Sequence, residues 1–138
     1  MKTLFDTSVI LDARDSKSPW HARAIDQIAE AVAGEGALVN PIVLAEASIR
    51  TTNKAAVLSE LEAWGLEIVD LPKAAALPAA TAFATYRERL KTEGKPGARL
   101  PLPDFFIGAH AKAAGLSLAT RDAQRVRTYF PDVPLITP

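Results

Sequence analysis

The feature that most constrains the fold is an alternation of short apolar runs with longer helical segments. Five runs are predicted strands: residues 3–5, 37–39, 66–71, 116–120 and 133–136. Between them, apolar residues recur every three to four positions, which is the spacing of one face of an α-helix. Such a chain is expected to form an α/β fold, with a mostly parallel sheet of four to five strands covered by helices on both faces.

Local signals place the ends of the predicted helices. Pro41 suits the first position of a helix, where its missing N–H costs nothing. Asn53 is a favourable cap for a helix that stops at Gly65. The other helices are expected to begin at Thr7 and to cover residues 19–32, a long segment before the loop 92–103, residues 103–114 and residues 122–130.

Length and composition narrow the class of protein. The 138 residues predict one domain, 1–138, that is large enough for a buried core. No apolar run approaches the roughly 20 residues of a membrane span, and the N-terminus lacks the apolar stretch of a signal peptide. The absence of cysteine excludes disulfides and thiolate zinc sites. A soluble, cytoplasmic protein without a membrane partner is expected.

The charges are unevenly distributed although the net charge is zero. Residues 1–72 carry six Lys and Arg against eleven Asp and Glu, whereas residues 73–138 carry ten against five. A basic half can attract a nucleic-acid backbone, but solvated helix faces are the more common explanation of such charge runs.

The stretch LFDTSVI, residues 4–10, sets a carboxylate among apolar residues. An unpaired charge in such surroundings destabilises the fold by roughly several kcal/mol, unless a shift of its pKa keeps the group neutral. Asp6 therefore either caps the helix that begins at Thr7 or belongs to a site that needs its charge.

Three further acids are predicted to lie near Asp6. In parallel α/β sheets the covering helices begin at the edge where the strands end, and ligands bind at that edge. Asp6 and Asp122 follow strands, Asp104 lies in the first turn of a helix, and Glu46 lies early in the helix after the second strand. Together the four would form an all-oxygen site suited to Mg²⁺ or Mn²⁺. Asp12, on the opening helix, and Asp70, at the end of the third strand, are weaker candidates.

Helix capping offers a simpler explanation for three of these acids. Asp6, Asp104 and Asp122 all stand beside helix starts, where aspartate is favoured. Glu46 lies inside a helix, on an otherwise apolar stretch, so capping does not explain it. Other acidic α/β folds fit less well. A dehalogenase-type phosphatase would need a second Asp two residues after Asp6, and a phospho-receiver domain would need a Lys after the last strand; the sequence has neither. It also lacks a Walker phosphate loop and a GxGxxG motif.

The segments FDTSVI, PIVLAEA, PDFFIGAHA and LATRDAQRVRTYFPDVPLITP together resemble the PIN-domain ribonucleases, and most closely the VapC-type toxins of bacterial toxin–antitoxin pairs. The resemblance covers essentially the whole chain and implies a three-layer α/β/α PIN-like fold. Gly108 stands where alanine is commoner, which should let a neighbour pack closer. No acid follows soon after Asp122, where some members of the family carry one.

The resemblance also implies residue roles and partners. Asp6, Asp104 and Asp122 would hold Mg²⁺ or Mn²⁺, with Glu46 completing the catalytic acids, and Thr7 and Thr120 would orient them. The implied activity is metal-dependent endoribonuclease cleavage by a homodimer, neutralised by a small antitoxin protein. In this hypothesis Arg121 and Arg125 steer the RNA backbone. A PIN-like module that binds RNA or a partner protein without cutting remains the alternative.

Overall fold

The five predicted strands form one sheet in the computed structural model, which describes residues 1–95 and 100–138. The strands are β1 (Thr3–Phe5), β2 (Ala37–Val39), β3 (Leu66–Ile68), β4 (Ser117–Ala119) and β5 (Leu135–Ile136). They lie in the order β3-β2-β1-β4-β5, and every neighbouring pair is parallel. The predicted α/β fold with a parallel sheet is confirmed.

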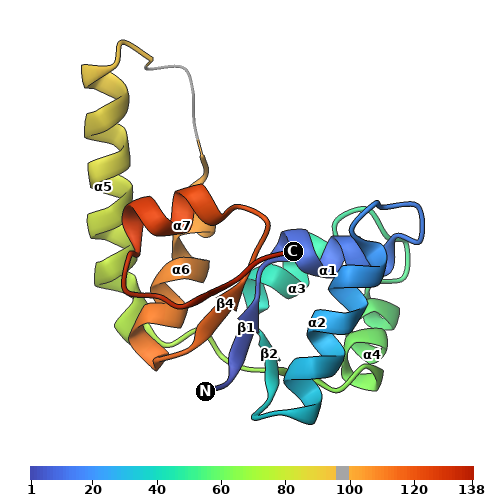
Figure 1. Ribbon diagram of the computed structural model, residues 1–138. Helices are drawn as coiled ribbons and strands as arrows, with labels where there is room; N and C mark the ends of the chain where they lie inside the picture. Colours follow the sequence, from blue (N-terminus) through green and yellow to red (C-terminus); the bar gives the residue numbers. More distant parts are fainter. Residues whose placement is uncertain (96–99) are drawn as a thin grey trace.

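Seven α-helices among the described residues cover the sheet in two groups (Figure 1). One group comprises α1 (Thr7–Arg14), α2 (His21–Ala33), α3 (Pro41–Ser48) and α4 (Lys54–Ala63). The other comprises α5 (Ala76–Thr92), α6 (Leu102–Ala114) and α7 (Ala123–Tyr129). No helix in the described ranges has the length and hydropathy needed to span a membrane. A 3-10 turn, η1 (Lys73–Ala75), was not predicted. Residues 96–99 of the predicted loop lie outside the described residues.

The predicted helix boundaries have clear local causes. The Asn40 side chain accepts a hydrogen bond from the Val43 N–H (3.0 Å), and Pro41 occupies the first turn of α3. Asn53 caps α4 in the same way. At the end of α6, Gly115 adopts φ 65°, a left-handed conformation that glycine reaches without steric cost.

An aromatic cluster joins the three helices on one face of the sheet. The fully buried Phe105 ring of α6 lies 5.4 Å from Phe83, 5.3 Å from Tyr86 and 5.3 Å from Tyr129, measured between ring centroids. Such offset and edge contacts favour the association of aromatic rings. This packing fixes the position of α6, whose first turn carries Asp104.

Gly108 allows a close approach between α6 and the segment after α7. A Cβ atom added at Gly108 would stand 2.4 Å from Cδ2 of the buried Phe130 ring. The expectation that this glycine lets a neighbour pack closer is therefore confirmed. Since Phe130 directly follows α7, the contact also sets the distance between α6 and the helix that begins next to Asp122.

Candidate active site

The chain changes direction across the sheet at β1. Strands β1, β2 and β3 proceed to one side, and β4 and β5 lie on the other. The connecting helices consequently cover opposite faces, which leaves a crevice at the carboxyl ends of β1 and β4. Asp6 directly follows β1, and Thr120 directly follows β4, so the strands bring both residues to this crevice.

Asp6 is buried, with 4% of its surface exposed, and both of its carboxylate oxygens accept hydrogen bonds. Oδ1 accepts from the Thr7 N–H (2.8 Å), which caps α1. Oδ2 accepts from the Thr120 hydroxyl (2.6 Å) and from the Ser8 hydroxyl (3.4 Å). Asp6 is therefore a helix cap and also a member of a buried polar group, so the two roles considered from the sequence do not exclude one another.

The two threonines expected to orient the acids both donate hydrogen bonds to them. The Thr7 hydroxyl donates to Glu46 Oε1 (2.7 Å), which ties α1 to α3. The fully buried Thr120 hydroxyl donates to Asp6 and accepts from the Asp122 N–H (2.9 Å). Ser8, which the sequence analysis missed, accepts from the Arg121 N–H (3.3 Å) as well as donating to Asp6.

Asp104 brings the fourth carboxylate from the first turn of α6. Among the described residues no group donates a hydrogen bond to its carboxylate. Burial raises the pKa of Asp104, and the charges of Glu46, Asp6 and Asp122 raise it further, whereas Arg125 lowers it. Since each of the other three acids acts on this pKa, the four carboxylates lie in one electrostatic environment.

Arg125 is the counter-ion of this acidic group. Its Nη1 lies 2.7 Å from Asp122 Oδ2, its Nη2 lies 3.6 Å from Asp6 Oδ2, and only 13% of its side chain is exposed. Asp122 also caps α7 by accepting from the Arg125 N–H (3.4 Å). The spacing of Asp122 and Arg125 on one helix could have predicted this ion pair.

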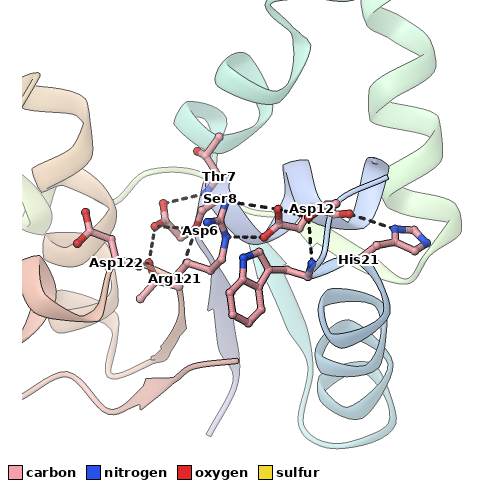
Figure 2. Close-up of polar contacts among 10 residues, drawn as sticks. Asp6, Thr7, Ser8, Asp12, His21, Arg121 and Asp122 are labelled. Carbon is pink, nitrogen blue, oxygen red and sulfur yellow. Dashed lines mark hydrogen bonds and ion pairs between the residues drawn. The ribbon is translucent and has the colours of Figure 1, made fainter. Parts of the chain in front are cut away.

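Arg121 points away from the four acids. Its Nε donates to Asp12 Oδ2 (2.6 Å), and its Nη2 lies 3.4 Å from Asp12 Oδ1 (Figure 2). Asp12, one of the weaker candidate acids, therefore pairs with Arg121. The two histidines also contribute no ligand to the acidic group: His110 is buried and bonded to Asn40, and the His21 ring bonds to the Asp12 carbonyl.

The capacity of the site to hold a metal depends on its donor atoms and their spacing. Within residues 1–95 and 100–138, no three His, Cys, Asp or Glu side chains stand close enough together to enclose a metal ion. The chemistry of the four acids nevertheless fits a hard divalent cation, because they supply only carboxylate oxygens. Within the described residues, the Asp104 carboxylate accepts no hydrogen bond. The Glu46 carboxylate accepts one, at Oε1, so its Oε2 is also available to a ligand.

Cavities border the acidic group at two places. One of 390 Å³ is lined by Thr7 and Glu46 together with residues of α1 and of the α3–α4 connection. Another, of 320 Å³, lies between α5 and α7 and is lined by Asp122 and Arg125. Glu46 and Asp122 are therefore reachable by a ligand larger than an ion.

Comparisons with known proteins agree with this architecture. The sequence profile of the PIN domain matches residues 3–131. The fold is similar to solved structures of VapBC2 from Rickettsia felis (19% identity, 99% of this chain and 98% of that chain, TM-score 0.64) and FitAcB from Neisseria gonorrhoeae (24%, 97% and 96%, TM-score 0.61). It is also similar to VapBC-1 from nontypeable Haemophilus influenzae (17%, 99% and 98%, TM-score 0.66). No curated protein sequence matches it significantly. Because the PIN-domain profile matches nearly the whole chain and the fold of the chain is similar to these structures, the chain belongs to the PIN domain family.

Proposed function

We propose that this protein is a metal-dependent endoribonuclease that hydrolyses RNA phosphodiester bonds. The observation that carries the proposal is the convergence of Asp6, Glu46, Asp104 and Asp122 from four separate elements on one crevice. Four gathered carboxylates repel one another, and one arginine neutralises only part of their charge, so a bound cation would relieve the remaining repulsion.

The side chains divide the work of the reaction. Asp6, Asp104 and Asp122 would hold Mg²⁺ or Mn²⁺, which when bound supplies positive charge for the phosphodiester and activates water. Glu46, with Oε1 held by Thr7, would orient the attacking water and accept its proton through Oε2. Thr7 and Thr120 hold the acids in place, and Arg125 balances part of their charge.

The same proposal includes a biological setting. Structures with a similar fold are named as VapBC complexes, as FitAcB and as a toxin–antitoxin complex from Klebsiella pneumoniae. By analogy, the chain acts in the cytoplasm as a homodimeric toxin, and a small antitoxin protein neutralises it. Co-expression with the product of an adjacent small reading frame tests this part, since a cognate antitoxin should co-purify and abolish cleavage.

A catalytically silent PIN-like module that binds RNA or a partner protein is the second candidate. The ion pairs of Arg125 favour it, because a permanent counter-ion would leave no place for a metal. The two candidates differ in their response to Mn²⁺. A working site gains unfolding free energy of about RT ln(1 + [L]/Kd) on binding the ion, and a silent module gains none.

The test compares cleavage and metal binding in matched variants. Asp6→Ser keeps a side chain that can cap α1, but a hydroxyl is a poor ligand for a hard cation. Asp26→Ser, at an exposed position of α2, is the control for loss of one acid. Calorimetric titration with Mn²⁺ and cleavage of a labelled RNA should both fail for Asp6→Ser alone. Wild-type protein that neither binds Mn²⁺ nor cuts RNA would refute the nuclease and leave the silent module.

A further inference from the structure

Asp12 is a buried carboxylate outside the four acids, and it holds two exposed groups. The residue is 6% exposed and lies on α1. Its Oδ2 accepts from Arg121 Nε, while Oδ1 lies 3.4 Å from Arg121 Nη2 and accepts from the Ser18 hydroxyl (2.9 Å). The Ser18 hydroxyl in turn accepts from the Trp20 N–H (3.1 Å). One buried charge thus tethers both Arg121 and the backbone of Trp20.

Arg121 is held firmly and still has free hydrogen-bond donors. A guanidinium carries five N–H donors, and Asp12 engages two of them. The other three have no acceptor among the residues that the structure describes, and 41% of the side chain is exposed. A guanidinium fixed in this way loses little conformational entropy when an anion binds, which favours recognition of a phosphate.

Trp20 stands where the local rules of helix formation predict a different residue. It occupies the N-cap position of α2 and makes no side-chain capping bond. Ser, Thr, Asp or Asn would suit that position better. Its side chain is large and apolar, yet 42% of the residue is exposed. Trp20 therefore departs from the capping preference and leaves part of its indole exposed, where it is available to a ligand.

The acidic group lies next to this tethered pair. The Arg121 N–H donates to the Ser8 hydroxyl, which donates to Asp6, and Arg121 directly precedes Asp122 in the chain (Figure 2). An exposed cation and a partly exposed indole whose residues are both tied to one carboxylate match the chemistry of one nucleotide, which offers a phosphate and a flat base. Only an unpaired base has a free face for stacking, so a single strand fits and a duplex does not.

We propose that Trp20 and Arg121, both held by Asp12, form a nucleotide subsite beside the acids for single-stranded RNA. Arg121 binds a phosphate next to the one that is cut, and Trp20 stacks on an unpaired base. The inference rests on the proposed nuclease function and deepens it, because it names residues that bind the RNA next to the cleaved bond and assigns Asp12 as a positioning residue.

The experiment measures binding without cleavage, in EDTA. Trp64→Phe leaves Trp20 as the sole tryptophan, and Trp20→Phe leaves Trp64 as the sole tryptophan. A short single-stranded RNA should quench the fluorescence of the first protein at saturation and leave that of the second nearly unchanged. The same RNA annealed to its complement should not quench Trp20.

Substitutions then separate the two contacts. Trp20→Ala should weaken binding of the single strand roughly 5- to 100-fold, the range for loss of one stacked base. Arg121→Gln should lower the slope of log affinity against log salt by about 0.7, the value for one phosphate contact on a single strand. Arg127→Gln, at an exposed position of α7, is the control for loss of one positive charge.

The outcomes distinguish this inference from the proposed function. Wild-type protein that binds and cuts RNA while Trp20→Ala and Arg121→Gln behave like the Arg127 control would overturn the subsite alone. Wild-type protein that cuts RNA with Mn²⁺ but does not bind it in EDTA would also overturn the subsite alone. Wild-type protein that neither binds RNA in EDTA nor cuts it with Mn²⁺ would overturn the proposed function and the subsite together. Arg121→Gln could fail to fold because Asp12 loses its partner. In that case the double variant Asp12→Asn, Arg121→Gln, which removes both charges, replaces it. Trp20→Ala tests the stacking contact independently.

Discussion

Thr120→Val is the substitution that best tests how the acidic site is held together. The hydroxyl of Thr120 is fully buried and bridges two acidic residues, since it donates to Asp6 Oδ2 (2.6 Å) and accepts from the Asp122 N–H (2.9 Å). Valine has nearly the same shape, so it creates no cavity. It removes both hydrogen bonds and leaves the Asp122 N–H without its partner.

The size of the effect follows from these two bonds. A hydrogen bond to a charged group contributes about 1.5–3 kcal/mol to stability, and an unpaired buried donor costs about 1–3 kcal/mol. Together they predict a loss of about 2.5–6 kcal/mol in the free energy of unfolding, a large part of the ~5–15 kcal/mol typical of a domain. For a chain of 138 residues this corresponds to a fall in Tm of roughly 10–20 °C.

Urea unfolding in chelator, followed by tryptophan fluorescence, measures this loss without any contribution from metal binding. Thr120→Ser is the control, because it keeps the hydroxyl and deletes one methyl group, at a cost of about 1 kcal/mol. The m-values should stay equal, which shows that the same surface unfolds in each protein. A valine variant as stable as the serine variant would refute the bridging role of the hydroxyl.

Three further predictions concern the acids and the packing of α6. Glu46→Gln keeps the acceptor for the Thr7 hydroxyl and removes a charge, so cleavage should be lost while unfolding in chelator shows equal or greater stability; a marked destabilisation would contradict this. Because burial and the neighbouring acids raise the folded-state pKa of Asp104 above 3.8, this residue binds more protons in the folded than in the unfolded protein just above that pH, and its contribution to stability falls as the pH rises through this window. Asp104→Asn should abolish this fall, so its stability relative to wild type should increase with pH in chelator, and parallel pH profiles would be evidence against it. Gly108→Ala should destabilise by roughly 1–2 kcal/mol, because crowding against the Phe130 ring outweighs the ~1 kcal/mol helical gain of alanine, and Phe130→Leu should restore most of the loss in a double-mutant cycle.

The sequence by itself determined the class of fold and the edge of the sheet that carries the acids. Both depend on local signals: the alternation of apolar runs with helical periodicity, and caps such as Asn53 that begin helices where expected. In a parallel sheet every strand ends at the same edge, so the placement of Asp6 and Asp122 follows from their position after a strand. The 3-10 turn at 73–75 was missed, because its three residues carry no periodic pattern.

The tertiary structure alone decided which partners the charges have. The sequence analysis treated Arg121 and Arg125 alike, yet Arg125 lies among the acids and Arg121 pairs with Asp12 across 109 residues of chain. Side-chain partners at such a separation depend on the packing of α1 against the turn after β4, and no local pattern encodes that distance. Local interactions select each element, whereas the field at Asp104 is the sum of charges that only the assembled fold brings within range.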